Sequence, residues 1–159
     1  MMQDMFGNII CSFLGTIGYA ILYNVPKKYY IGCGITGVAG WMIFLFFRRQ
    51  MMTSSATASF FGALVVVLIA RMLTVRMKCP ITIFLISGIF PLVPGAGIYY
   101  TVYYLVTNQL SMASLKGMES IKIVFAIVLG IVIVVQIPRD YFHIDFLRKR
   151  WREKVEASK

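Results

Sequence analysis

Two prolines and two glycines lie close together inside an apolar stretch of this sequence, where residues 90–97 read FPLVPGAG. Proline has no N–H group, so a helix that runs through Pro91 and Pro94 loses two hydrogen bonds. Each proline ring also clashes with the preceding helical turn. We therefore predict that a helix breaks or kinks at this point.

The residues that follow the second proline could bind an anion. If the helix restarts with Pro94 near its first position, the N–H groups of Gly95, Ala96 and Gly97 have no partners within the helix. These groups and the positive end of the helix dipole attract a carboxylate, and glycine allows it to approach the backbone closely. Many transporters hold a substrate carboxylate in this way near the middle of the membrane. We interpret Pro91 and residues 94–97 as a candidate substrate site; a kink that serves only helix packing is the alternative.

Three further residues could belong to a polar path. Tyr99 and Tyr100 follow the break, and a tyrosine deep in a membrane needs a partner for its hydroxyl group, so either could line the path. Arg71 is a cation inside an apolar run, near the end of that run. Its side chain would either reach out to the membrane surface or attract an anionic substrate.

The elements that must position these residues are membrane helices. Hydrophobic residues make up 59% of the 159 residues and charged residues only 14%, which excludes a soluble enzyme domain, a disordered chain and a disulfide-stapled secreted module. A membrane helix needs about 20 apolar residues. Solidly apolar runs, without the alternation of barrel strands, occupy residues 5–24, 29–47, 56–75, 81–106 and 120–137. We predict an all-α integral membrane protein of about five transmembrane helices, the fourth broken, as one domain over residues 1–138.

The distribution of Lys and Arg predicts the orientation. With the N-terminus outside, 12 of these cations lie on the cytoplasmic side and 4 outside, as the positive-inside rule requires. Residues 139–159 form a basic tail in which apolar residues recur at helical spacing beside the cations. This pattern is typical of an amphipathic helix on anionic lipid, so we do not expect nucleic acid to bind despite the net charge of +10.

The sequence offers few groups for catalysis, metal binding or proton coupling. Asp4 and Glu119 lie at the edges of the apolar runs and none of the runs contains an acid, so a coupling carboxylate would have to come from another chain. Paired carboxylates, an HExxH motif and a phosphate-binding loop are all missing. The three cysteines form no CxxC motif, and the single histidine, His143, cannot fill a metal shell. We predict no enzyme activity, no cofactor and no metal.

Small residues at helical spacing predict where helices touch, because close backbone approach replaces the hydrophobic effect inside lipid. These residues would form contacts with other helices of this chain or with helices of a partner. The sets are Gly7, Cys11, Gly15 and Gly18; Gly32, Gly34, Thr36, Gly37 and Gly40; Ala58 and Gly62; and Ala126 and Gly130.

Three motifs resemble the threonine/serine exporter family in its small-subunit form. They are FLGTIGYAILYNVP at residues 13–26, GVAGW at 37–41 and PLVPG at 91–95. The resemblance runs from the first apolar run to the fifth, in order. It implies a secondary exporter of the bacterial cytoplasmic membrane, in which this chain is similar to the second half of the longer, single-chain form.

The resemblance also implies partners and substrates. A larger membrane subunit would complete the exporter and carry the coupling group. Threonine, serine or succinate would be the substrate, and each has a carboxylate that suits the site at 94–97. Two other hypotheses remain: a scaffold subunit that stabilises a partner containing the whole pathway, and a pore formed by self-association.

Overall fold

The computed structural model describes residues 2–137, which fold into helices without any strand in that range. The predicted all-α class is confirmed for these residues, whereas the basic tail at 139–159 and His143 lie outside them. The helices are α1 (Met2–Leu22), α2 (Tyr30–Gln50), α3 (Ser55–Met77), α4 (Thr82–Ile89), α5 (Gly95–Val106) and α6 (Leu110–Val135). Short 3-10 turns, η1 (Lys27–Tyr29) and η2 (Phe90–Leu92), precede α2 and follow α4.

Several of these helices are long and apolar enough to cross a membrane. Three qualify alone, and a fourth span forms if the bent pair Thr82–Leu92 and Gly95–Val106 is taken together. Helix α1 contributes a shorter apolar segment, Phe6–Leu22. A multi-helix membrane protein is thus confirmed, while the count of five spans and the outward N-terminus stay predictions. The last helix begins at Leu110 rather than at residue 120, which matters for the site below.

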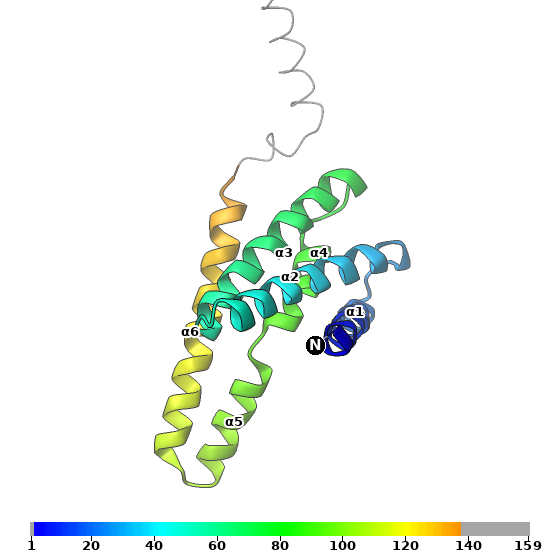
Figure 1. Cartoon of the computed structure of the whole chain (residues 1–159). Helices are drawn as coiled ribbons and strands as arrows, with labels where there is room; N and C mark the ends of the chain where they lie inside the picture. Colours follow the sequence, from blue (N-terminus) through cyan, green and yellow to red (C-terminus); the bar gives the residue numbers. More distant parts are fainter. Residues whose placement is uncertain (1, 138–159) are drawn as a thin grey trace, which may run out of the picture.

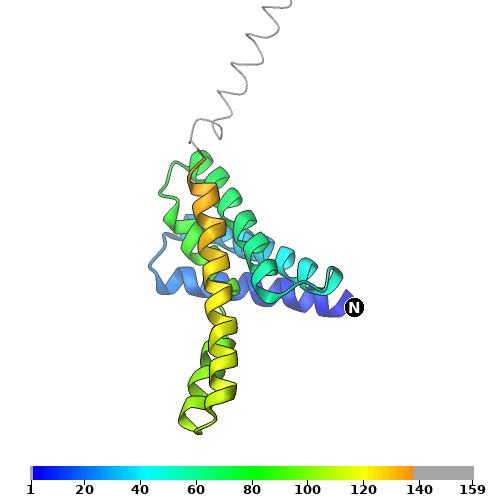
Figure 2. The same cartoon turned by 90° about the vertical axis from the view of Figure 1, so that its left-hand side faces the viewer.

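Helices α2 and α3 form the centre of the molecule. Helix α2 contacts α1, α3 and α4, and α3 also packs along α6. Helix α5 packs mainly against α6 and has no buried residue. Figures 1 and 2 both show α5 and the first half of α6 side by side, extending away from the other helices.

Glycine allows the central helices to approach closely, as the small-residue pattern predicts. A Cβ atom added at Gly40 of α2 would lie 2.3 Å from Val66 of α3, and one at Gly130 of α6 would lie 3.0 Å from the Phe60 carbonyl oxygen. The first distance is too short for a side chain, and the second is so tight that a neighbouring atom would have to move. The glycines of α1 behave differently, because nothing lies within 4 Å of a Cβ at Gly7, Gly15 or Gly18. That face of α1 has room for side chains within the described chain.

The core beneath the break is apolar. Leu92 of η2 is 4% exposed and packs with Ala63 and Val66 of α3 and Ile127 of α6. Gly62 leaves room for it, since an added Cβ there would lie 3.0 Å from a Leu92 methyl group. Burial of Leu92 therefore anchors the interrupted segment to α3 and α6.

Candidate functional site

The fourth apolar run is interrupted where its prolines predict. Helix α4 ends at Ile89, η2 follows over Phe90–Leu92, and Val93 is extended before α5 begins. The helical segments on either side of the break are bent by 53°. Pro91 lies within η2, where its missing N–H removes the donor that would continue α4. The predicted break is confirmed.

Pro94 shapes the start of α5 in a way that the sequence does not reveal. It is the N-cap residue of α5 rather than its first residue, with φ −76° and ψ 58°. These angles form an inverse γ-turn, in which the Gly95 N–H donates to the Val93 carbonyl oxygen at 2.8 Å. The expectation that the Gly95 N–H is without a partner is therefore wrong.

Two unpartnered amides remain at this helix start. Ile98 donates to the Pro94 carbonyl oxygen at 3.0 Å, but within residues 2–137 no acceptor reaches the N–H groups of Ala96 and Gly97. The backbone at Gly95 is open, because a Cβ there would meet nothing within 4 Å. The positive end of α5 thus retains two donors beside an open glycine.

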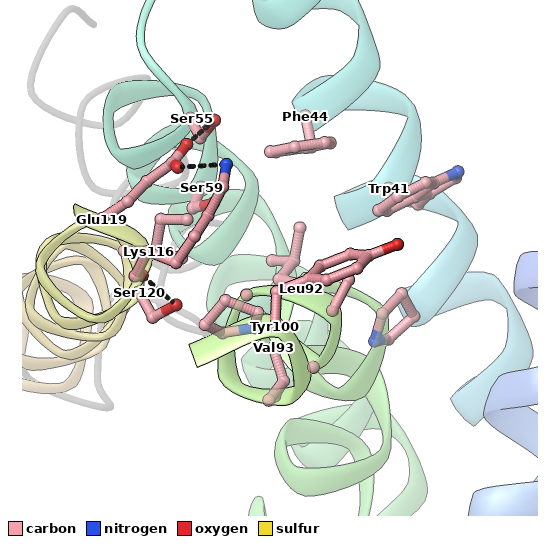
Figure 3. A pocket seen from close by; sticks show the side chains of 16 residues that line it. Trp41, Phe44, Ser55, Ser59, Leu92, Val93, Tyr100, Lys116, Glu119 and Ser120 are labelled. Atoms are coloured by element: carbon pink, nitrogen blue, oxygen red, sulfur yellow. Dashed lines mark hydrogen bonds and ion pairs between the residues drawn. The ribbon is translucent and has the colours of Figure 1, made fainter. Parts of the chain in front are cut away.

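A cavity of about 370 Å³ lies over this helix start (Figure 3). Residues 91–97 and Tyr100 form one wall, and three other helices complete it. Residues from one face of each helix contribute, at helical spacing: Trp41 and Phe44 of α2, Ser55 and Ser59 of α3, and Lys116, Glu119, Ser120 and Ile123 of α6. The cavity thus brings together the interrupted span and three helices distant from it in sequence.

The first half of α6 brings a pair of charges to the cavity. Gly97 lies against Ser120, since a Cβ at Gly97 would be 2.3 Å from the Ser120 hydroxyl oxygen. One turn earlier, Lys116 Nζ lies 3.3 Å from Glu119 Oε2. Ser55 Oγ of α3 donates to Glu119 Oε1 at 3.5 Å. The close approach of α5 and α6 at Gly97 brings this ion pair to the same cavity as the open amides.

The position of α6 corrects one sequence-based assignment. A span beginning at residue 120 put Glu119 outside the membrane helices, whereas α6 begins at Leu110 and contains Glu119 in its interior. An acid of this chain therefore lines the cavity. The spacing of residues 116, 119, 120 and 123, which share one helix face, was the signal that could have found it.

Ser59 adds a buried hydroxyl group to the cavity wall. The residue is 1% exposed, and within the described chain its Oγ atom has no hydrogen-bond partner. A buried hydroxyl without a partner costs free energy, so polar contents of the cavity would stabilise it. Nothing in the sequence distinguishes this serine from the other serines of the chain.

The two tyrosines predicted as alternatives differ in position. Tyr100 lines the cavity, while Tyr99 is 63% exposed and is not among the lining residues. The ring of Tyr99 stacks on Tyr103, with 6.4 Å between centroids, along the surface of α5. Of the two, Tyr100 is the one that the fold brings to the site.

Arg71 lies apart from the cavity. It is 8% exposed, and its guanidinium group donates to the carbonyl oxygens of Val135, at 2.7 Å, and Ile137. These are carbonyls at the C-terminal end of α6, where a cation also complements the helix dipole. Arg71 thus links α3 to the C-terminal end of α6. This role differs from both predicted roles, which were reaching the membrane surface and attracting an anionic substrate.

A second cavity, of about 250 Å³, adjoins the first. Its lining comes mainly from α1 and includes Asn8, Ser12 and Thr16. Trp41 and Pro91 line both cavities. The indole Nε1 of Trp41 donates to Asn8 Oδ1 at 3.4 Å, so this wall is tied to α1. No set of three metal-binding side chains gathers within residues 2–137.

Comparison with known proteins places the chain in a family. A family model described as "Threonine/Serine exporter, ThrE" matches residues 8–137, which extend from within α1 past the end of α6. Neither the curated proteins nor the solved structures gave a match. Members of this family are transporters. With most of its length matched, the chain belongs to the threonine/serine exporter family.

Proposed function

We propose that this chain is the small membrane subunit of a two-component secondary exporter, and that the cavity at the α4–α5 break binds the carboxylate of its substrate. The observation that carries the proposal is the pair of unpartnered N–H groups, on Ala96 and Gly97, at the wall of a cavity of about 370 Å³. The substrates in view are threonine, serine or succinate, and the membrane is the bacterial cytoplasmic membrane.

The chemistry of the cavity supports a carboxylate. Two main-chain donors at the positive end of a helix match its two oxygen atoms, and the open backbone at Gly95 lets it approach. Lys116 lines the same cavity and provides a positive charge. An anion placed between them would contact preorganised donors in a largely apolar surrounding, where electrostatic attraction is strong.

Surface features support a second subunit. Helix α5 has no buried residue, and the glycine face of α1 has room for side chains in the described chain. In lipid, exposed small residues pack more closely against protein than against acyl chains. Exposed tyrosine hydroxyls find hydrogen-bond partners in protein but not in acyl chains. A larger subunit that covers α5 and α1 would enclose the cavity and complete the pathway.

Two variants of one glycine test the site. Gly95→Leu fills the space above the free amides, whereas Gly95→Ala places a methyl group where nothing lies within 4 Å. We expect Gly95→Leu to abolish efflux of threonine, serine or succinate from loaded cells and Gly95→Ala to retain it. Both proteins must reach the membrane with the larger subunit, which an immunoblot of membrane fractions checks. Normal efflux with Gly95→Leu would exclude this cavity as the site.

The scaffold and pore hypotheses make different predictions. If the chain only supports a partner, substrate will not protect single cysteines at residues 92–100 from thiol-specific labelling. If the chain forms a pore by self-association, the purified chain alone will give passive, non-saturable flux in liposomes. Protection at 92–100, together with saturable flux that needs both subunits, supports the proposed function over both alternatives.

A further inference from the structure

We infer that the Lys116–Glu119 ion pair determines the charge type of the substrate: it opens so that Glu119 binds the ammonium group of a zwitterion while Lys116 joins the amides around its carboxylate. This inference rests on the proposed substrate site, because it assigns roles to charges that line the same cavity. It concerns the choice between an amino acid and a dicarboxylate, which the sequence leaves open.

The cavity carries balanced charges. Among the described residues that line it, Lys116 and Glu119 are the only charged ones, so their formal charges cancel. A zwitterion is also neutral overall and adds no net charge to the cavity. A dicarboxylate would bring two negative charges against one lysine and one acid, and the acid would repel it.

The Lys116–Glu119 ion pair can open at little cost. Its partners are three residues apart on α6, with one contact of 3.3 Å, and their side chains are 45% and 49% exposed. An exposed pair of this kind contributes little to stability, so replacing the contact costs little. A ligand that offers one charge to each partner replaces the lost contact with two new ones.

Hydrogen-bond donors and acceptors line different parts of the cavity. The amides of Ala96 and Gly97 are donors for a carboxylate. Glu119, which Figure 3 shows beside Ser55 and Lys116, is an acceptor that α6 brings to the same cavity. Ser59, whose buried hydroxyl group has no partner in the described chain, is an independent sign that the cavity holds a polar molecule. The cavity thus has separate places for a negative end, a positive end and a third polar group.

Two charge-neutralising variants shift selectivity in opposite directions. Glu119→Gln leaves Lys116 unopposed and favours a dianion, whereas Lys116→Met leaves Glu119 unopposed and disfavours it. Inside-out membrane vesicles with both subunits would take up labelled threonine, with unlabelled succinate as competitor. Selectivity is measured as a ratio: the succinate concentration that halves threonine uptake, divided by the threonine concentration that half-saturates uptake. We expect this ratio to fall about tenfold or more in Glu119→Gln, as for loss of one charged hydrogen bond. The same ratio should rise in Lys116→Met.

The controls separate this inference from a structural role. Lys122→Met removes a charge from α6 outside the cavity lining and should leave the ratio unchanged. Glu119→Asp keeps the negative charge and should keep most of the preference for threonine. If both neutralising variants lower uptake without moving the ratio, or move it in the same direction, the ion pair does not select charge.

Failure of the inference is distinguishable from failure of the proposed function. Normal efflux with Gly95→Leu would show that the cavity is not the substrate site. Loss of efflux with Gly95→Leu, combined with an unchanged ratio in both charge variants, retains the site and overturns the role of the ion pair. Uptake of succinate but not of threonine by the unmodified exporter would also overturn the inference while retaining a carboxylate site.

Discussion

Replacing Gly97 by alanine should disturb the contact between α5 and α6 that forms one wall of the cavity. The added Cβ would lie 2.3 Å from the Ser120 hydroxyl oxygen and 3.6 Å from the Ser120 Cβ. The first distance is far below van der Waals contact and the second is ordinary, so the hydroxyl group alone creates the conflict. Ser120 also donates to the Lys116 carbonyl oxygen at 2.9 Å, and turning away would break that bond.

The expected size of the effect follows from these contacts. Overpacking by one methyl group costs about 1–3 kcal/mol, and the lost hydrogen bond contributes about 1 kcal/mol within that range. Alanine has a better helix propensity than glycine by up to about 1 kcal/mol, so Gly95→Ala, whose methyl group meets nothing, is the reference. We expect Gly97→Ala to be about 1–2 kcal/mol less stable than Gly95→Ala.

A double variant identifies the cause. Ser120→Ala removes the clashing oxygen, so Gly97→Ala combined with Ser120→Ala should recover most of the lost stability. The measurement is denaturant unfolding of the purified chain in detergent micelles, read as a double-mutant cycle. Equal stability of Gly97→Ala and Gly95→Ala, or no recovery in the double variant, would refute the close approach of α5 and α6 at this point.

Three further predictions use the same stability measurement. Arg71→Met should destabilise the chain by about 2 kcal/mol, because the carbonyls of Val135 and Ile137 lose a charged donor; an unchanged stability would mean that this contact is unimportant. Lys78→Gly should stabilise it by about 1 kcal/mol, since Lys78 ends α3 in the left-handed region at φ 51°; a loss would contradict the cap. Gly18→Leu, at an exposed position of α1, should change stability by less than about 0.5 kcal/mol yet reduce co-purification of the proposed larger subunit; normal co-purification would place the partner elsewhere.

The strongest sequence predictions came from local chemistry. A proline cannot donate a hydrogen bond in any environment, so the break at Pro91 and Pro94 was foreseeable without knowing what surrounds it. Glycine pairs in α2 and α3 likewise predicted close packing, and Gly40 and Gly62 do meet. The α1 glycines follow the same pattern but have open space beside them, because spacing alone cannot say which face finds a neighbour.

The site members that the sequence missed depend on tertiary contact. Lys116 and Glu119 are ordinary polar residues until α6 packs beside α5 and brings them over the break. The search for apolar runs began the last span at residue 120, so it excluded the more polar residues 110–119 at the start of α6. The Gly95 hydrogen bond was missed for a different reason, because the γ-turn depends on the ψ angle of Pro94, which the sequence does not specify.

The turn at Pro94 affects how tightly the cavity can bind a substrate. By using the Gly95 amide internally, it leaves two main-chain donors where three were expected. The loss of one hydrogen bond to a charged group costs about 1.5 kcal/mol or more, which raises the dissociation constant roughly tenfold. We expect such a carrier to run slowly at ordinary metabolite levels and to speed up as they accumulate, acting as an overflow route that spares the cell's working supply.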